Sequence, residues 1–309
     1  MTEAQIITLI KRHYAVHVDS VEFFREGGCV SYIAFGAGEK YLLKIVNKAF
    51  MDTVKQSVHI MTFLAGHDFP VPRIISAADG RCYIATTDHD CERICILFTF
   101  IEGREPGLGE RMEETGELVG RLHHLMSRYG GSLTVHDKAF FIDRYIDILR
   151  RKAYPEIKLA RYIEYGDALW ESVKALPRGF CHGDLHRGNL LLTPSGQLYL
   201  LDFDTSCLGF PAYDAMVICD ATDYFYFDPG GFDRATRIYG EFLNGYTRHH
   251  SITDAERDAF YSLIAIRHYQ LQATIVEMNG LDCIGEAFID RQLDWLMRWR
   301  EQCSKVALH

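Results

Sequence analysis

The chain has 309 residues, of which 48% are hydrophobic and 24% charged, and its formal net charge is −9. This composition is that of an ordinary globular protein long enough for two lobes, and its negative charge argues against a nucleic-acid partner. No stretch reaches the roughly 18 apolar residues that a membrane span requires, so we expect no membrane partner. Nine cysteines at irregular spacings are typical of free thiols in a reducing compartment, so we expect a cytoplasmic protein.

The first hundred residues predict a small, mostly β lobe. Residues 1–12 have the pattern of an amphipathic helix and lack the apolar core of a signal peptide. Strands are predicted at 21–24 and 30–35, on either side of a glycine-containing turn, and a third strand at 40–46. A helix is then predicted over 51–65.

Residues 94–103 predict a buried strand that runs into a turn, and the chain beyond them is predicted to be mainly helical. In the helix predicted over 112–125, Gly116 and Gly120 are four positions apart. Glycines at this spacing permit close backbone packing, which we expect to be against the catalytic segment described below. Further helices are predicted at 141–149, 157–176, 232–249, 254–277 and 289–303.

Two short motifs carry the chemistry. Residues 182–189 read His-Gly-Asp-Leu-His-Arg-Gly-Asn, and residues 201–204 read Leu-Asp-Phe-Asp. Between the motifs lie two apolar segments, 190–192 and 198–201, that predict strands joined by a turn at 193–197.

A tight hairpin between these strands would bring Asn189 and Asp202 side by side at one end. Amide and carboxylate oxygens are ligands that suit Mg²⁺, with water and phosphate completing the coordination shell. Asp184 would lie beside these two ligands without itself having to bind the metal. The arrangement matches the requirements of phosphoryl transfer, in which one aspartate orients and deprotonates an alcohol while an asparagine and an aspartate bind the metal ions.

The motifs carry a family resemblance. His-x-Asp-x-x-x-x-Asn, followed by an apolar strand and an aspartate, resembles the signature of the protein-kinase-like superfamily. The form His-Gly-Asp-Leu-His-x-Gly-Asn is more similar to the aminoglycoside phosphotransferase and choline kinase family, and residues 208–214 resemble the Gly-x-Pro-x-x-Asp segment found there. The resemblance extends over nearly the whole chain, with its motifs concentrated between positions 181 and 214.

The resemblance implies an α+β protein-kinase-like fold with two lobes, a small β-rich N-lobe over 1–97 and a larger helical C-lobe over 98–309. In the C-lobe it implies a hinge at 98–103, a catalytic loop at 182–189 and a metal-binding segment at 201–204. Asp184 is then the catalytic residue, and Asn189 and Asp202 are the Mg²⁺ ligands, with Asp204 also facing the metal.

For the nucleotide, ATP or GTP, the resemblance aligns Lys44 with the lysine that contacts the α and β phosphates, a role that suits a cation on a long stem. The hinge places Phe98 and Phe100 beside the base, whose edge meets backbone groups. Gly28 and Ser31 could add a backbone N–H group and a hydroxyl near phosphate. No Gly-x-Gly-x-x-Gly pattern is present, and nothing distinguishes ATP from GTP.

One position departs from the family pattern. A helix glutamate normally pairs with the lysine, but the corresponding residue is Ser57 and its neighbours are not acidic. Lys44 therefore either lacks its usual partner or is held by Asp202 and the nucleotide. Ser57→Glu is expected to be tolerated if Lys44 has no other carboxylate, and harmful if it has one. The departure favours a nucleotide-binding pseudokinase with a regulatory role, whereas the intact catalytic and metal motifs favour an enzyme.

The acceptor is suggested by the segment from 188 to 233, which holds seven aspartates and no lysine or arginine. In the family, Asp214 tethers the catalytic loop. Asp220 and Asp223 lie near the aromatic run that begins at Tyr224, and carboxylates mixed with aromatic faces suit an ammonium group. A solvated acidic loop beside core aromatics is an equally good interpretation. Arg267 either binds a carboxylate of the substrate or pairs with a structural carboxylate such as Asp214.

The sequence therefore predicts transfer of the γ-phosphoryl group of ATP or GTP to a hydroxyl of a small molecule. An amine-bearing acceptor is favoured, such as an amino alcohol, a homoserine-like compound or an aminoglycoside. The oligomeric state is not predicted.

Overall fold

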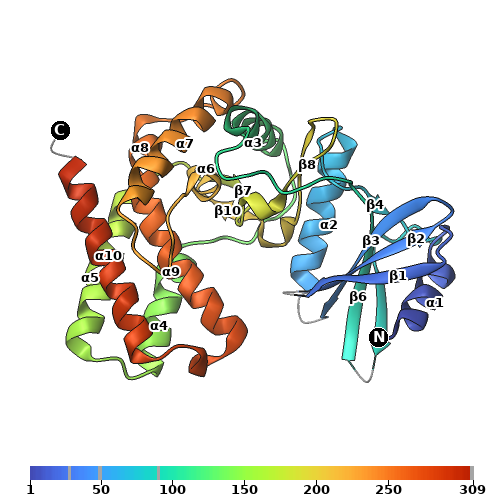
Figure 1. Cartoon of the computed structure of the whole chain (residues 1–309), viewed down its shortest axis with the longest axis horizontal. Helices are drawn as coiled ribbons and strands as arrows, with labels where there is room; N and C mark the ends of the chain where they lie inside the picture. The colour runs from blue at the N-terminus through green and yellow to red at the C-terminus, as the bar shows by residue number, and fades with distance from the viewer. Residues whose placement is uncertain (27–28, 48–50, 89–90, 307–309) are drawn as a thin grey trace. The chain divides into compact units, whose positions relative to one another are not determined.

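The computed structural model describes residues 1–26, 29–47, 51–88 and 91–306, and in it the chain forms two compact units. The first unit comprises Met1–Pro106, Tyr129–Ser132 and Arg187–Ser206, and the second comprises Gly107–Arg128, Leu133–His186 and Cys207–His309. Residues 187–206, which the resemblance assigns to the C-lobe, thus pack within the first unit. The predicted α+β fold is confirmed, with an antiparallel sheet in the N-terminal part and helices in the C-terminal part (Figure 1).

The first unit is built on a six-stranded antiparallel sheet of order β1-β2-β3-β6-β4, with β5 pairing β6. The three predicted N-terminal strands and the predicted helix are present, whereas β4 and β5 were not predicted. The elements of this unit are α1 (Glu3–His13), β1 (Ser20–Glu26), β2 (Val30–Gly36), β3 (Glu39–Asn47), α2 (Met51–Gly66), β4 (Ile74–Ile75), β5 (Ile84–Asp88), β6 (Cys91–Thr99), η3 (Arg187–Asn189), β8 (Leu190–Leu192), β9 (Leu198–Leu200) and η4 (Phe203–Thr205).

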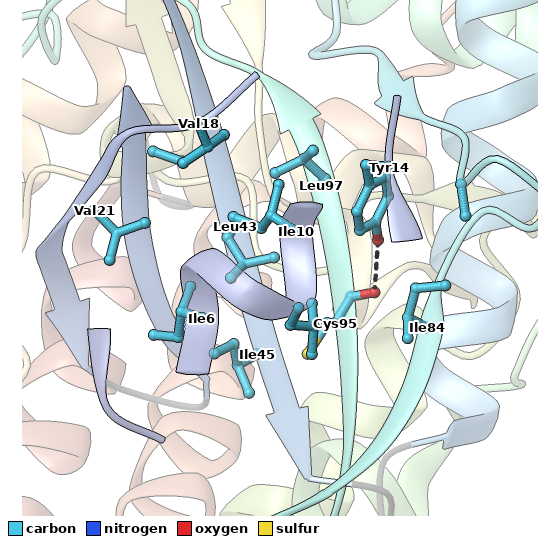
Figure 2. Packing of buried hydrophobic residues seen from close by; sticks show 13 residues of the cluster. Ile6, Ile10, Tyr14, Val18, Val21, Leu43, Ile45, Ile84, Cys95 and Leu97 are labelled. Carbon is cyan, nitrogen blue, oxygen red and sulfur yellow. Dashed lines mark hydrogen bonds between the residues drawn. The ribbon is translucent and has the colours of Figure 1, made fainter. Parts of the chain in front are cut away.

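Helix α1 covers one face of this sheet. A capping box formed by Thr2 and Gln5 starts the helix, and Ile6, Ile10 and Tyr14 recur on its inner side. Figure 2 shows these side chains against residues of β3, β5 and β6, and the Tyr14 hydroxyl donates to the backbone oxygen of Cys95 at 3.3 Å. The buried cluster fixes which face of each strand points inward.

Strand alternation then places Lys44 on the opposite face of the sheet. Leu43 and Ile45 belong to the cluster under α1, so the side chain between them points away from it. Ser31 is the partner of Lys44 in the β2–β3 register, and Phe98 is the partner of Leu42 in the β3–β6 register. The two predicted nucleotide-binding residues on these strands therefore share the face of Lys44.

The second unit is mainly helical, as predicted, with one short two-stranded sheet formed by β7 and β10. The predicted helix over 254–277 is divided at Ala259, and the one over 141–149 is preceded by a π-helical turn. The elements are α3 (Met112–Met126), η2 (Ala139–Asp143), α4 (Arg144–Arg151), α5 (Glu156–Val173), β7 (Gly179–Cys181), β10 (Cys207–Gly209), α6 (Pro211–Cys219), α7 (Gly230–Tyr246), α8 (Asp254–Asp258), α9 (Phe260–Asn279), η5 (Leu281–Cys283) and α10 (Glu286–Val306).

The expectation that Gly116 and Gly120 pack against the catalytic segment is wrong, because the backbone they approach is that of α7. A Cβ added at Gly116 would lie 2.0 Å from the backbone oxygen of Phe242, and one at Gly120 would lie 2.5 Å from that of Tyr246. Both distances are far below any real Cβ contact, so only glycine allows α3 to approach α7 this closely. Across the described residues, no helix is long and apolar enough to cross a membrane.

Candidate active site

The predicted hairpin between the two motifs is confirmed. Strands β8 and β9 pair from Leu190 opposite Leu200 to Leu192 opposite Leu198, and Gly196 in the turn has a φ of 85°, which favours glycine. One step beyond the ladder, the Leu201 N–H group donates to the backbone oxygen of Asn189 at 2.9 Å.

This last hydrogen bond brings Asn189, which is buried, next to the residue that precedes Asp202. Asp202 has a φ of 60° and a ψ of 72°, in the left-handed region that a non-glycine residue adopts at a cost of about 1 kcal/mol. Backbone strain of this kind persists only where the surroundings impose it, and it concentrates at functional sites.

Lys44 is paired with two carboxylates of the second motif. Its Nζ lies 2.9 Å from Oδ1 of Asp202 and 2.6 Å from Oδ2 of Asp204, and its side chain is 11% exposed. Burial alone would lower the pKa of Lys44, but these two carboxylates outweigh it and hold the pKa above its usual value. Lys44 is therefore a cation at any working pH.

This pairing answers the question raised by Ser57. Ser57 is buried on α2, and the carboxylates that meet Lys44 come from η4 and the residue before it. Asp204, expected to face the metal, is the second carboxylate partner of the lysine. Helix α2 holds the segment after η4 by another contact, in which Nε2 of Gln56 donates to the backbone oxygen of Ser206 at 2.5 Å.

The sequence did not predict Arg25, at the end of β1, as part of this group. Its Nη2 lies 3.7 Å from Oδ2 of Asp202, and its side chain is 53% exposed. The only signal in the sequence was its position directly before the predicted glycine turn. Gly28, in that turn, lies outside the described residues. Ser31 is buried opposite Lys44.

The segment after β6 carries the two predicted base-binding residues. Phe98 is buried on β6, and the Phe100 N–H group donates to the backbone oxygen of Lys40 at 3.4 Å. The Lys40 ammonium also lies 5.6 Å from the centre of the Phe100 ring. Within the described residues, no backbone hydrogen bond engages Ile101 or Glu102. Their backbone groups can meet the edge of a base.

In the second unit, Asp214 at the start of α6 holds the backbone of the catalytic loop, as the resemblance implies. Its Oδ2 accepts from the N–H group of His182 at 2.5 Å, and its Oδ1 accepts from that of Gly183 at 3.0 Å. The buried Nε2 of His123 lies 3.1 Å from the same Oδ2, and Nδ1 of His123 lies 2.7 Å from the Tyr246 hydroxyl. The loop is thus tied to α3, α6 and α7.

Asp184, the predicted catalytic residue, lies between two cationic or potentially cationic groups. Arg267 donates from Nη2 to Oδ1 at 3.1 Å, and Nε2 of His186 lies 3.5 Å from Oδ2. Burial alone would raise the pKa of Asp184, but His186 and Arg267 hold it well below its usual range. Asp184 is therefore a carboxylate at any working pH, suited to accepting a hydrogen bond and poorly suited to acting as a strong base.

Arg267 meets a carboxylate of the protein, but not the one suggested from the sequence. It pairs with Asp184 instead of Asp214, and its Nη1 donates to the Tyr213 hydroxyl oxygen at 3.4 Å. Tyr213 was not predicted. No sequence signal pointed to it, since it occurs within an apolar run of α6.

The two aspartates suggested for the acceptor differ in their surroundings. Asp220 accepts from the Tyr224 hydroxyl at Oδ2 and from the Thr222 N–H group at Oδ1, the latter at 2.8 Å, and burial raises the pKa of Asp220 above its usual value. Asp223 is exposed, and its Oδ1 accepts from the N–H group of Phe225 at 2.8 Å, so it shapes the local turn. Among the described residues, no three His, Cys, Asp or Glu side chains form a metal site of their own. The Mg²⁺ site predicted from the sequence is of another kind, in which one amide and one carboxylate oxygen would be joined by phosphate and water oxygens.

Comparison with known proteins shows the family. The model of a family described as "Phosphotransferase enzyme family" matches residues 30–256. The homoserine kinase of Zymomonas mobilis is 25% identical over 210 residues, which cover 65% of this chain and 62% of that protein.

Two solved structures share the fold. An amicoumacin kinase in complex with AMP-PNP, Ca²⁺ and Ami matches with a TM-score of 0.77 at 17% identity, over 98% of this chain and 94% of that one. A microcompartment-associated aminopropanol kinase also matches with a TM-score of 0.77 at 17% identity, over 97% of this chain and 95% of that one. The chain therefore belongs to the phosphotransferase enzyme family and has its protein-kinase-like fold.

Proposed function

We propose that this protein is a nucleotide-dependent kinase that transfers the γ-phosphoryl group of ATP or GTP to a hydroxyl of a small molecule. The observation that carries the proposal is the pairing of Lys44 with Asp202 and Asp204 in the absence of a helix glutamate. The argument for a pseudokinase was that Lys44 lacks a carboxylate partner, and these two aspartates provide one. In this family, a lysine held in this way is available to the phosphates of a nucleotide.

In the proposed reaction, the acceptor oxygen bonds to the γ-phosphorus while the bond from phosphorus to the β–γ bridging oxygen breaks and nucleoside diphosphate leaves. Asp184 accepts a hydrogen bond from the acceptor hydroxyl and orients it for attack. The hydroxyl proton passes to Asp184 late in the step, once the acceptor oxygen has donated electrons to phosphorus and its proton has become acidic, and then to solvent. Because this transition state is loose, positioning and charge stabilisation provide most of the rate.

Asn189 and Asp202 fit a Mg²⁺ site. They present one amide oxygen donor and one carboxylate at the end of the β8–β9 hairpin, the donor types that Mg²⁺ prefers, and they leave further positions for phosphate oxygens and water. When bound, Mg²⁺ would neutralise charge on the phosphates. Lys44 contributes a second positive charge to the same phosphates.

We further propose that the acceptor carries an amine. Asp220 is the group that supports this, because it is a partly buried carboxylate that accepts hydrogen bonds from two neutral groups, the Tyr224 hydroxyl and the Thr222 N–H group. A substrate ammonium would compensate its charge. Homoserine and aminopropanol, after which two of the similar proteins are named, both combine an amine with a hydroxyl.

The test is a screen of the purified protein with ATP or GTP and Mg²⁺ against amino alcohols, homoserine-like compounds, aminoglycosides and matched alcohols without an amine. Nucleoside diphosphate release is measured after subtraction of release without acceptor. Turnover of a hydroxyl acceptor is the expected result, with amine-bearing members preferred. Nucleotide binding without turnover of any acceptor would support the regulatory alternative.

Asp220→Asn tests the amine separately. It is expected to raise KM for an amine-bearing acceptor by about tenfold or more, the size of one charge-assisted hydrogen bond, and to leave KM for its amine-free counterpart within a few-fold. An equal change for both acceptors would show that Asp220 does not bind the amine.

A further inference from the structure

Arg267 is a buried arginine whose partners come from two other segments of the second unit. It lies on α9 with 9% of its side chain exposed, and it donates to Asp184 of the catalytic loop and to Tyr213 of α6. Guanidinium stays charged even when it is buried, and its planar fork fixes the direction of each N–H group. The fold therefore holds a rigid cation against one oxygen of a single carboxylate.

Helix α6 supports the catalytic loop from two consecutive positions. Asp214 binds the loop backbone at His182 and Gly183, whereas Tyr213 contacts the arginine that binds the loop's aspartate. The backbone and the side chain of the loop are thus fixed separately. Arg267 contacts the Asp184 carboxylate, whereas Asp214 contacts the backbone N–H groups of His182 and Gly183.

Other ionisable groups face the same pair. His186 lies 3.5 Å from Oδ2 of Asp184, and the charge of Arg267 is also felt by Asp220 and by the Tyr213 and Tyr224 hydroxyls. His186 has 46% of its side chain exposed and is therefore screened by water. Arg267 is the buried cation of the group.

We propose that Arg267 is a positioning residue for the phosphoryl transfer, restricting rotation of the Asp184 carboxylate so that it meets the acceptor hydroxyl in one orientation. This role rests on the proposed function. A misplacement of about 1 Å at a reacting group can reduce the rate by about 10²-fold, so a fixed carboxylate has a clear kinetic value.

The contact also predicts a pH effect. Burial favours the protonated form of Asp184, while His186 and Arg267 favour the carboxylate. Without Arg267, one of the two groups that oppose the effect of burial is lost, so the pKa of Asp184 rises. Because the proposed transfer requires the carboxylate, activity without Arg267 should be lost as the pH falls through this raised pKa, at a higher pH than in the wild type.

The experiment compares Arg267→Met, Arg267→Lys and the control Arg144→Met. Arg144 is a partly buried arginine that contacts Thr274 of the same helix α9 and pairs with Glu277. Two quantities are measured, the titration of the Asp184 carboxyl carbon by NMR, assigned with Asp184→Asn, and the pH profile of kcat with the acceptor found by the screen.

Arg267→Met is expected to raise the pKa of Asp184 and to lower kcat by about 10- to 100-fold, with nucleotide KM within a few-fold. Arg267→Lys keeps the charge without the fork, so its pH profile should resemble that of the wild type at a reduced kcat. If Arg267→Met fails to fold, the reduced kcat of Arg267→Lys with a wild-type pH profile tests the proposal instead. Arg144→Met should change neither the titration nor the profile.

An unchanged Asp184 titration in Arg267→Met, or a loss of kcat equal to that in Arg144→Met, would overturn the proposal. The NMR titration does not depend on turnover. If the wild type phosphorylates none of the screened alcohols, the proposed function fails, yet the titration still decides whether Arg267 controls Asp184.

Discussion

At the scale of single residues, the two motifs place carboxylates in different electrostatic surroundings. Asp202 and Asp204 share the ammonium of Lys44, whereas Asp184 is held by a guanidinium and faces a histidine. The guanidinium and the histidine keep Asp184 ionised, although burial alone would raise its pKa. The proposed reaction needs both sets charged, one towards the nucleotide and the other towards the alcohol.

Asp184→Asn should abolish transfer and spare nucleotide binding. An amide cannot accept the hydroxyl proton, and a loss of about 10²- to 10⁴-fold in kcat is the usual size of this effect. Affinity for the Mg²⁺–nucleotide complex, measured by calorimetric titration, should remain within a few-fold. Asp147→Asn, an exposed aspartate on α4, is the control and should keep full turnover. Equal turnover in the Asp184 variant would remove this residue from the mechanism.

Asp204→Asn tests the second partner of Lys44. The change removes one charge-assisted hydrogen bond while Asp202 still holds the ammonium, so kcat/KM should fall by about tenfold or more. A variant with wild-type kcat/KM would show that Asp202 alone is sufficient.

Ser57→Glu also tests which carboxylates pair with Lys44, because in the structure these are Asp202 and Asp204 and not a residue of α2. Ser57 is buried, and an added carboxylate would be desolvated at an effective cost of several kcal/mol. We therefore expect a lower melting temperature and lower activity. Improved activity with unchanged stability would mean that Lys44 still lacks a partner.

At the scale of elements, the packing of α3 on α7 depends on glycine, and the two helices offer a matched pair of substitutions. Gly116→Ala should destabilise the protein, because its Cβ would meet the α7 backbone and force the helices apart. Gly240→Ala, on α7 with nothing within 4 Å of the added Cβ, should stabilise it by about 0.5–1 kcal/mol through helix propensity. Thermal unfolding of both variants measures the difference, and the same sign for both would contradict the packing explanation.

The elements that the sequence predicted well are those whose signal is local. Strand alternation, the turn at 193–197 and helix periodicity depend on neighbours in the sequence, and each appears in the structure. Strand β4 was missed because it has only two residues, and β5 because its sequence, Ile-Ala-Thr-Thr-Asp, does not alternate between apolar and polar residues.

In the candidate active site, too, the sequence predicted the contacts that depend on neighbouring residues and not those between distant ones. Asn189 and Asp202 are brought together by a short hairpin, so their proximity follows from local structure. The pairing of Arg267 with Asp184 spans 83 positions, and that of Lys44 with Asp204 spans 160. Partners at such separations are selected by tertiary packing, which leaves no periodicity in the sequence.

At the scale of the whole molecule, Mg²⁺–nucleotide should stabilise the fold by mass action. A ligand at about 100 times its Kd adds about 2.7 kcal/mol, which raises the melting temperature measurably. Asp202→Ala should remove most of the part of this shift that requires Mg²⁺, since it deletes the proposed anionic ligand. Melting curves with a non-hydrolysable nucleotide, with and without Mg²⁺, make the comparison. An unchanged Mg²⁺-dependent shift would place the metal elsewhere.

The division of the first unit between distant stretches of chain limits how related genes can be recombined. A chimera with residues 1–106 from one family member and the remainder from another would combine Lys44 of the first parent with the acidic partners of the second, 158 and 160 positions away. A graft that moves 187–206 together with 1–106 keeps the ion pairs of one parent. In this chain, Lys44 pairs with carboxylates at 202 and 204 and not with a residue of α2. A chimera keeps this pairing only when both stretches come from the same parent.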